Sequence, residues 1–173
     1  MPRPDQPGFV SLSIPTEDGK FTATYSGDGL VALDFPEKAT AKKSSNSGTA
    51  HTKTQVGRWH RQTIAALKRV LNGREPQALP PLDVSAGTGF QRRVWNELLR
   101  INPGRTRSYG EIARAIGSPK AVRAVGGACG ANPIPVLIPC HRVLAANRKI
   151  GGFSGGMDWK RKLLACEGVM VSE

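Results

Sequence analysis

Two helix starts near the middle of the chain constrain its fold more than any other feature. Thr88 is followed three residues later by Gln91, and Ser108 is followed in the same way by Glu111. In such a pair the hydroxyl accepts a hydrogen bond from the third helical residue, whose own side chain reaches back to the backbone of the first. The sequence therefore predicts one helix beginning at each pair.

A third helix is predicted directly after the second. Gly117 ends the second helix, and Ser118-Pro119 offers an N-cap with proline at the first helical position. Two short helices joined by a glycine-containing turn are typical of a helix-turn-helix, although an ordinary helical hairpin is the commoner arrangement. Small residues leave one face of the third helix able to approach another backbone closely: Ala121, Ala124, Gly126, Gly127 and Ala128.

The N-terminal part predicts a small antiparallel sheet over residues 9–35. Apolar Val10, Leu12 and Ile14 alternate with polar neighbours, which is the pattern of a half-buried strand. Two further runs rich in strand-forming residues follow, separated by turn residues at 26–29.

A helix is predicted after this sheet and ends at Asn72-Gly73. Residues 36–57, rich in Lys, Ser and Thr and without periodicity, predict a long loop or linker before it. Residues 79–84 predict an extended connector, because successive prolines disfavour helix. The apolar face of the helix is expected to hold Trp59, Thr63, Ile64, Leu67, Val70 and Leu71.

The last forty residues contain three predicted elements. The apolar run Ile134–Ile138 is long enough for one buried strand. Gly151–Gly156 predicts a loop whose glycines allow backbone amides to approach a ligand. A final helix begins near Met157 and ends at Gly168, with Trp159, Leu163 and Cys166 expected on one side.

Positive charge is concentrated in the C-terminal half. The net charge is +12, and residues 86–173 carry 14 Lys and Arg against 5 Asp and Glu. Such an excess favours a polyanionic partner such as nucleic acid, with a solvated basic surface as the alternative. We expect an α/β fold of the α+β type, divided into domains at residues 1–85 and 86–173. No apolar run approaches the ~20 residues of a membrane span, so no membrane partner is expected.

The run Pro139-Cys140-His141-Arg142 places a nucleophile beside a base. A free cysteine is most often a small buried apolar residue, but a neighbouring histidine can make a thiolate available. Adjacent side chains diverge, so a bridging water is the easier connection between them. Glu167 is the candidate that orients His141, and its position at the C-terminal end of a helix requires a compensating partner or task.

The chain has an odd number of cysteines, all in its C-terminal half. This argues against a disulfide framework and predicts a reducing compartment. The N-terminus also does not resemble a secretory signal, so we expect the protein in the cytoplasm. Zinc is a rival use of these thiols, but their spacing matches no familiar ligand pattern. We therefore expect no metal and no other cofactor. The residues of that rival site are Cys129, Cys140, His141 and Cys166.

Residues 88–168 resemble the C-terminal domain of the O6-alkylguanine-DNA alkyltransferases. Ordered motifs at matching spacing carry the resemblance: Phe90–Trp95, Ser108-Tyr109, Ile112-Ala113, Arg123–Gly126, Asn132-Pro133, Ile138–Val143, Ser154–Gly156, Leu163-Leu164 and Glu167-Gly168. The resemblance implies a ribonuclease-H-like N-terminal domain, a helix-turn-helix and a suicide repair protein. Such a protein flips a damaged guanine out of duplex DNA and moves the alkyl group from O6 irreversibly to its own cysteine. Repair of O4-alkylthymine is also implied.

The resemblance also implies residue roles. Cys140 becomes the alkyl acceptor, His141 takes its proton through a water, and Glu167 orients His141. Tyr109 would contact the phosphate and donate to guanine N3. Asn132 would be a hinge between the helix-turn-helix and the nucleophile.

The remaining implied residues concern DNA and the base. Arg123 would enter the base stack, because flipping costs stacking that an intercalating side chain replaces. The expected partner is double-stranded DNA, bound in the minor groove without sequence preference by a monomer, with cooperativity left open. Further DNA contacts are expected at Ala124, Gly126 and Ala128. The base pocket is expected to include Pro135, Val143, Gly151, Phe153 and Ser154.

Departures from the family pattern and rival functions remain open at this point. Phe153, Arg148 and Gly110 differ from common family residues, which puts pocket dimensions in question, and Pro135 and Gly151 suggest room for adducts such as benzyl. One rival is a binding-only relative, although such proteins lack the acceptor cysteine. The others are a cysteine hydrolase or transferase with turnover and a DNA-binding regulator.

Overall fold

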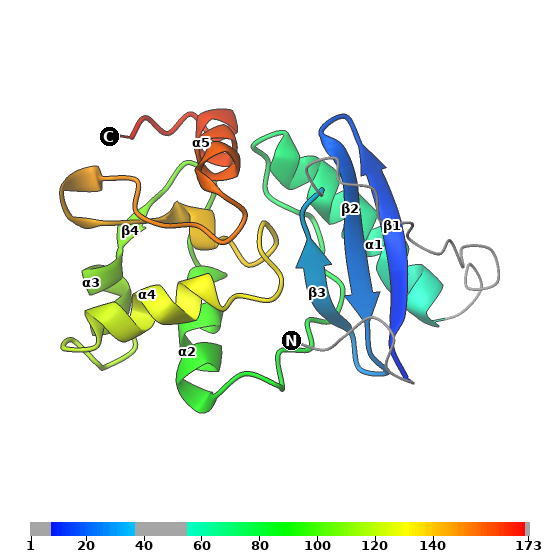
Figure 1. Ribbon diagram of the computed structural model, residues 1–173, viewed down its shortest axis with the longest axis horizontal. Coiled ribbons are helices and arrows are strands. Elements are labelled where there is room, and N and C mark those ends of the chain that lie inside the picture. Colours follow the sequence, from blue (N-terminus) through cyan, green and yellow to red (C-terminus); the bar gives the residue numbers. More distant parts are fainter. Residues whose placement is uncertain (1–7, 37–54, 172–173) are drawn as a thin grey trace.

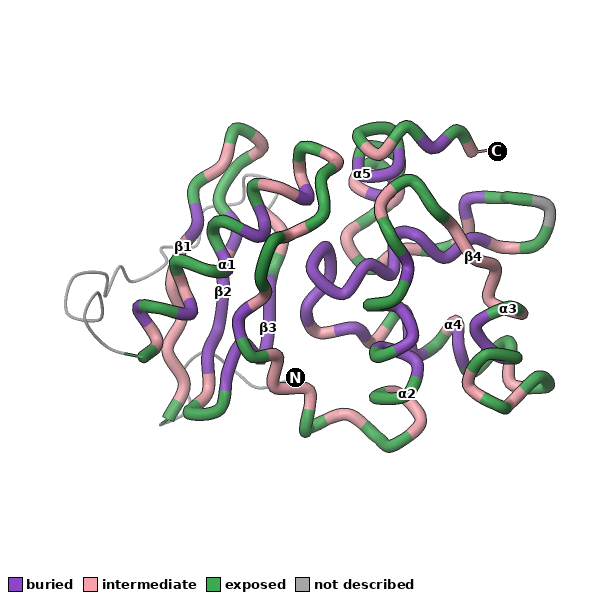
Figure 2. The backbone as a smooth tube through the Cα atoms, turned by 180° about the vertical axis from the view of Figure 1, so that it is seen from behind, coloured by how far each residue is buried: buried purple, intermediate pink, exposed green. Residues whose placement is uncertain are grey.

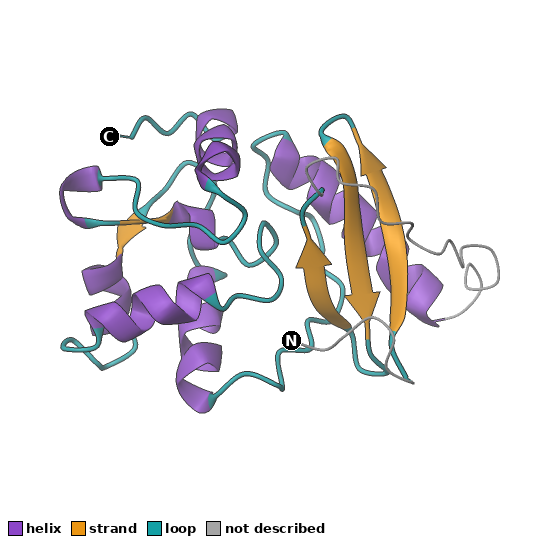
Figure 3. Cartoon of the chain, viewed as in Figure 1, coloured by secondary structure: helices purple, strands orange, loops and turns teal. Residues whose placement is uncertain are grey.

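The computed structural model describes residues 8–36 and 55–171 and has a mixed α/β fold of the α+β type. A three-stranded sheet and one helix form the N-terminal part, and the C-terminal part is mainly helical (Figure 1, Figure 3). The main elements are β1 (Val10–Thr16), β2 (Gly19–Tyr25), β3 (Leu30–Asp34), α1 (Gln55–Leu71), α2 (Gly89–Leu98), β4 (Arg107–Ser108), α3 (Tyr109–Ala115), α4 (Val122–Gly130), β5 (Val143–Leu144) and α5 (Met157–Cys166). Two 3-10 turns, η1 (Cys140–Arg142) and η2 (Ala146–Arg148), flank β5.

The predicted N-terminal sheet is confirmed. It is antiparallel with the order β1-β2-β3, and Leu12 pairs with Ala23 while Ala23 pairs with Leu33. The predicted turn between β2 and β3 is closed by the Ser26 amide, which donates to the Gly29 carbonyl over 2.8 Å. Strands β2 and β3 are largely buried, as Figure 2 shows, because both lie inside the N-terminal core.

Helix α1 packs against this sheet and corrects two expectations. It begins at Gln55, so the loop predicted to extend to residue 57 ends earlier; residues 37–54 of that loop lie outside the described part of the chain. Ile64 is 37% exposed, whereas Trp59 and Leu67 on the predicted face are buried. Gly73, with a φ of 68°, follows the helix in the left-handed conformation that glycine favours.

Both predicted capping boxes are present. The Thr88 hydroxyl accepts from the Gln91 amide and the Gln91 side chain accepts from the Thr88 amide at the start of α2. Ser108 and Glu111 make the same reciprocal pair at the start of α3. These pairs satisfy backbone groups that the first turn of a helix otherwise leaves without partners.

The predicted start of the next helix is wrong. Helix α4 begins at Val122, because residues 118–121 form a turn in which the Ala121 amide donates to the Ser118 carbonyl over 2.9 Å. Pro119 occupies the second position of that turn, which its fixed φ favours, and Ser118 is therefore not an N-cap. The connection between α3 and α4 is longer than the three residues expected.

The predicted strand at Ile134–Ile138 is also wrong. The segment is buried but folds into a tight loop, with an isolated bridge between Pro135 and Ile138. The Ile138 amide donates to the Ile134 carbonyl over 2.9 Å, and Val136 has a φ of 74°, which is rare for a β-branched residue. Apolar content predicted the burial of this segment, and Asn132 directs its path through hydrogen bonds to two of its backbone groups.

Helix α5 returns the chain toward the sheet. Leu163 is buried as predicted, whereas Cys166 is exposed and corrects its placement on the apolar side. The N-terminal and C-terminal parts meet at β3, where the Leu33 amide donates to the Pro133 carbonyl over 3.0 Å. In both views β3 is the strand nearest the helical part (Figures 1 and 2). A domain boundary at residue 85 stays a prediction.

Among the helices of residues 8–36 and 55–171, none combines the length and apolar character that crossing a bilayer requires.

Candidate active site around Cys140

Cys140 lies at the start of η1 and at the wall of an open cleft of about 1070 Å³. Its side chain is buried, and its amide donates to the Ile138 carbonyl over 2.8 Å. The surrounding backbone therefore holds the Cys140 thiol in place at the cleft wall. The wall is formed by Tyr109, Lys120, Ala121, Val122, Arg123, Ala124, Gly126, Cys129, Gly130, Cys140, Gly152, Phe153 and Ser154.

Asn132 connects the end of α4 with the loop that carries the thiol. Its amide nitrogen donates to the Ile138 carbonyl over 2.8 Å and to the Cys140 sulfur over 3.1 Å. Its oxygen accepts from the Ile134 amide over 3.0 Å. All of its polar atoms are thus engaged inside the core, as a buried amide requires.

The Cys140 thiol is protonated at rest. Burial raises the pKa of Cys140 to about 11, against the opposing effects of the Asn132 hydrogen bond and the Lys160 charge. A nucleophilic thiolate therefore requires a base when the reaction occurs.

His141 is the neighbouring base, and it is not among the residues that line the cleft. Its side chain is fully buried and its Nε2 lies 3.0 Å from Oε1 of Glu167. A carboxylate only accepts, so Nε2 carries the hydrogen and Nδ1 keeps its lone pair. Nδ1 has no hydrogen-bond partner among the described residues. Burial lowers the pKa of His141 against the opposing effect of Glu167, so the ring is neutral at pH 7 and able to accept a proton.

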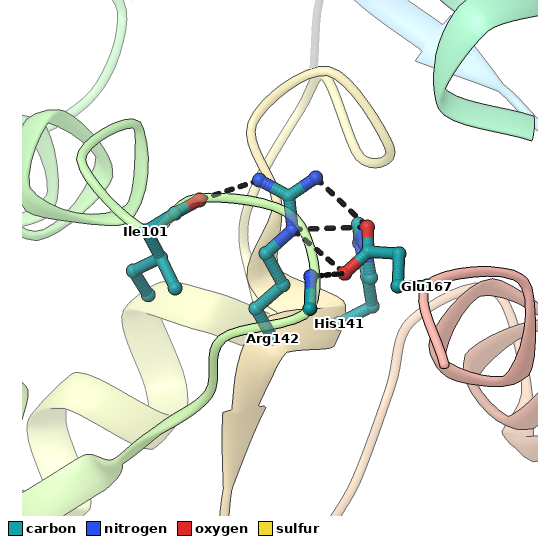
Figure 4. A network of polar contacts seen from close by, with 5 residues as sticks. Ile101, His141, Arg142 and Glu167 are labelled. Carbon is teal, nitrogen blue, oxygen red and sulfur yellow. Dashed lines mark hydrogen bonds and ion pairs between the residues drawn. The ribbon is translucent and has the colours of Figure 1, made fainter. Parts of the chain in front are cut away.

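Arg142 is a functional residue that the sequence analysis missed. Its Nε lies 3.0 and 3.1 Å from the two oxygens of Glu167, and its Nη2 lies 2.8 Å from Oε1 (Figure 4). Its Nη1 donates to the Ile101 carbonyl, which ties α2 to this network. The signal was present, because a carboxylate at a helix C-terminus requires a cation and Arg142 directly follows the histidine.

Glu167 is ionised across a wide pH range. Burial raises its pKa, but the hydrogen bonds and charges of His141 and Arg142 outweigh burial and lower the pKa to about 2. The Gly104 amide adds a further hydrogen bond to Oε2 over 3.2 Å. A permanent carboxylate can fix the tautomer of His141 and stabilise the imidazolium that forms when the ring takes a proton.

Lys160 is a second missed residue. It is fully buried on α5, and its Nζ donates to the carbonyls of Val143 (2.7 Å) and Gly152 (3.2 Å). Burial lowers the pKa of Lys160 to about 8. The sequence contained a signal for this burial. Lys160 lies three and four positions before Leu163 and Leu164, so it shares the buried face of their helix.

Tyr109 lies at the first turn of α3 and faces the cleft. Burial raises its pKa, so the hydroxyl stays a hydrogen-bond donor near pH 7. A side chain at Gly151 would lie 3.1 Å from the Tyr109 oxygen, so the glycine leaves room for the ring.

The predicted base pocket is partly reproduced at the cleft wall. Phe153 and Ser154 line it, but the wall described above does not include Pro135, Val143 or Gly151. Pro135 and Val143 are buried, and the Val143 carbonyl already accepts from Lys160. A contact between these residues and a base stays a prediction.

Helix α4 brings three predicted DNA-contacting residues to the cleft. Arg123 and Ala124 are exposed, and Gly126 is half-buried beside Tyr109. Ala128 instead faces the core, where its carbonyl accepts from the Trp95 indole over 2.8 Å. The small residues of α4 thus serve both helix packing and an open cleft.

The other two cysteines are Cys129 and Cys166. Cys129 lines the cleft, and burial raises its pKa to about 12. The rival zinc site finds no support, because Cys166 is exposed and, within residues 8–36 and 55–171, no three His, Cys, Asp or Glu side chains are grouped to hold a metal.

The site thus combines a buried thiol at the wall of a cleft with a buried network of His141, Glu167 and Arg142, and helix α4 borders the same cleft. Residues 89–169 match the family model described as 6-O-methylguanine DNA methyltransferase, DNA binding domain. A Haemophilus influenzae relative named methylated-DNA–protein-cysteine methyltransferase is 35% identical over 162 residues, covering 88% of this chain and 83% of that protein. The chain belongs to the methylated-DNA–protein-cysteine methyltransferase family.

Solved structures agree with this assignment. The crystal structure of Mycobacterium tuberculosis O6-methylguanine methyltransferase has a TM-score of 0.70 at 36% identity, covering 92% of both chains. A complex of the Mycobacterium tuberculosis protein with DNA has a TM-score of 0.68 at 36% identity, covering 92% of this chain and 91% of the other.

Proposed function

We propose that this protein repairs DNA directly, by moving an alkyl group from O6 of guanine to Sγ of Cys140, once per molecule. The arrangement of Cys140, His141 and Glu167 carries the proposal. Cys140 faces a cleft beside α4, while His141 and Glu167 form a buried 3.0 Å pair behind it. Family membership supplies the reaction class, methylated-DNA–[protein]-cysteine S-methyltransferase.

The Cys140 proton passes through a bridging water to Nδ1 of His141, and Glu167 stabilises the resulting imidazolium. The thiolate attacks the alkyl carbon, an S–C bond forms, and the O6–C bond breaks with its electron pair on the guanine. The product thioether is stable to hydrolysis, so each molecule reacts once.

Tyr109 assists departure of the guanine in this proposal. Its hydroxyl, kept protonated by its raised pKa, donates to N3 of the flipped base as negative charge develops there. Phe153 and Ser154 line the same cleft and would hold the base. O4 of alkylated thymine would present an equivalent leaving oxygen.

Arg123 and α4 are proposed to deliver the cleft to the duplex through the minor groove. Arg123 is exposed at the cleft edge, where its side chain can replace the flipped base in the stack. A groove that carries little base information suits repair without sequence preference. We further propose that the protein acts as a monomer in the cytoplasm. We also propose a hinge role for Asn132, because its backbone amide donates to the Cys129 carbonyl of α4 over 3.3 Å while its side chain bonds the loop of the thiol.

Intact-mass measurement after mixing with duplex containing O6-methylguanine tests this function. We expect a gain of one methyl mass, located on Cys140 by peptide mapping, with a yield that never exceeds one per protein molecule. Cys129→Ser and Cys166→Ser should react as the unmodified protein does, and Cys140→Ser should not react. The same assay with a duplex containing O4-methylthymine tests the second substrate. Competition by a minor-groove ligand tests the proposed binding groove.

Other outcomes separate the rival functions. Multiple turnovers would indicate a cysteine transferase that regenerates its thiol. Tight binding without mass gain would indicate a binding-only protein or a regulator.

A further inference from the structure

The loop Gly151–Gly156 forms one wall of the cleft but belongs to no helix or strand. Phe153 projects from this loop to the cleft wall. Within the loop, one turn is closed by the Gly156 amide, which donates to the Phe153 carbonyl over 3.1 Å. A loop of this kind keeps its position only through contacts with its surroundings. Because the loop forms one wall of the cleft, the residues that contact it determine the width of the cleft.

Lys160 supports the loop at the Gly152 carbonyl, and the N-terminal part supports it at Phe153 and Gly155 through Phe35, the residue that follows β3. The ring of Phe35 meets the ring of Phe153 in a T-shaped arrangement, with centroids 5.7 Å apart and planes at 73°. Edge-to-face contact of this kind is favourable and orientation-dependent. One ring of the cleft wall is therefore oriented by a residue from the opposite end of the chain.

Phe35 also contacts the loop at Gly155. A Cβ at Gly155 would lie 2.7 Å from Cζ of Phe35, so the loop backbone rests directly on the ring. The two contacts, one with the Phe153 ring and one with the Gly155 backbone, place Phe35 behind the loop as seen from the cleft.

Phe35 is itself held by neighbouring aromatic rings. Its centroid lies 5.0 Å from that of Trp159 on α5 and 5.6 Å from that of the buried Phe21 on β2. Trp159 and Phe21 meet edge to face at 5.4 Å. Lys162 lies over Trp159 and is also paired with Asp18 of the β1–β2 turn, which holds α5 against the sheet.

We propose that Phe35 is a positioning residue that sets the alkyl-group size accepted at Cys140, by fixing the Gly151–Gly156 loop from behind. This inference rests on the proposed function. Truncation of Phe35 leaves space into which the loop relaxes, and the cleft widens. A side chain at Gly155 pushes the loop off Phe35 toward the cleft, and the cleft narrows. The two changes therefore act in opposite directions on substrate size.

Transfer rates from duplexes carrying O6-methylguanine and O6-benzylguanine test the inference. Phe35→Ala should slow methyl transfer about tenfold, because misplacement by about 1 Å can cost up to about a hundredfold, while benzyl transfer is largely kept. Gly155→Ala should slow benzyl transfer more than methyl transfer. The double variant should return the benzyl-to-methyl ratio toward the original value, since the added Cβ then occupies the space that the ring left.

Leu67→Ala is the matched control, because it truncates a fully buried side chain of α1 and lowers stability while every aromatic ring is kept. Its benzyl-to-methyl ratio should be unchanged. Equal ratios for Phe35→Ala, Leu67→Ala and the unmodified protein would overturn the inference. A double variant that transfers methyl more slowly than Phe35→Ala alone would also overturn it, because the added Cβ would then not fill the space that the ring left.

A second probe separates this inference from the proposed function. In a Cys129→Ser and Cys166→Ser background, iodoacetamide and N-benzyliodoacetamide can alkylate Cys140 without DNA, so their rate ratio reports the access to this thiol alone. A ratio shift in Phe35→Ala with these reagents, together with no transfer from DNA by the unmodified protein, would overturn the proposed function and support the role of Phe35. An unchanged reagent ratio would overturn the role of Phe35.

Discussion

Arg142 holds the carboxylate of Glu167 at both oxygens, with Nε 3.0 Å from Oε1 and 3.1 Å from Oε2. Oε1 is also the atom that faces Nε2 of His141. One carboxylate oxygen thus contacts both the Arg142 guanidinium and the His141 ring. Glu167 is the C-cap of α5, and its two partners from η1 offset the unfavourable position of a negative charge at the end of a helix. A buried carboxylate with such partners stabilises a positive imidazolium without moving.

Glu167→Gln should slow alkyl transfer to Cys140 by about 10²-fold, because general-base catalysis contributes about 10²–10⁴-fold and the amide cannot stabilise the imidazolium as a carboxylate does. Arg142→Met should also slow transfer, since Glu167 then loses the cation that orients it. Single-turnover kinetics with methylated duplex provides the measurement.

Glu97 offers a matched control for Glu167. It is also a buried carboxylate paired with two arginines, Arg100 and Arg107, but it lies on α2 and outside the cleft wall. Glu97→Gln should lower stability with little change in the transfer rate. An equal rate loss in both variants would assign the effect to general destabilisation.

Acid stability should depend on the same carboxylate. The pKa of Glu167 falls from 4.5 to about 2 in the folded protein, so its contribution is present above pH 4.5 and is lost as pH falls toward 2. Between pH 5 and pH 3 the unmodified protein should lose about 2 kcal/mol more unfolding free energy than Glu167→Gln. Urea titrations at both pH values measure this difference, and parallel losses would contradict it.

Local signals predicted the elements that depend on neighbouring residues. The capping pairs Thr88–Gln91 and Ser108–Glu111 and the turn before β3 are short-range interactions, and all three are present. The sequence also indicated Cys140, His141 and Glu167 as candidate site residues, because a thiol, an imidazole and a carboxylate together suit only a few kinds of chemistry.

Other features were not predictable from residue propensity and periodicity. The Ile134–Ile138 loop depends on the side chain of Asn132, and no propensity encodes that bond. The proposed support of Phe153 by Phe35 joins segments more than a hundred residues apart, so periodicity carries no sign of it. The α4 start was misplaced because Ser118-Pro119 suits a turn as well as a helix N-terminus.

Asn132→Ala should raise the pKa of the Cys140 thiol above its value of about 11, because the amide hydrogen bond lowers it. Alkylation of Cys140 by iodoacetamide, in a Cys129→Ser and Cys166→Ser background, should increase about tenfold per pH unit below that pKa, since the thiolate reacts. The variant should react about tenfold more slowly at each pH below 10. The exposed Asn102→Ala serves as control, and superimposed profiles for Asn132→Ala and the parent would exclude the hydrogen bond as a cause.

Arg123→Ala should separate reaction with duplex from reaction with the free base. The exposed arginine lies at the edge of the cleft, on the helix proposed to enter the groove, whereas the acceptor is buried at its wall. Extrusion of a base costs a few kcal/mol, so loss of the side chain that fills the stack should slow repair of methylated duplex at least tenfold. Free O6-benzylguanine needs no extrusion, and its rate should change less than twofold. Arg74→Ala, which removes an exposed arginine after α1, controls for the loss of one positive charge. Comparable slowing with duplex and free base would place the effect of Arg123 on the chemistry at Cys140 and contradict a role in base extrusion.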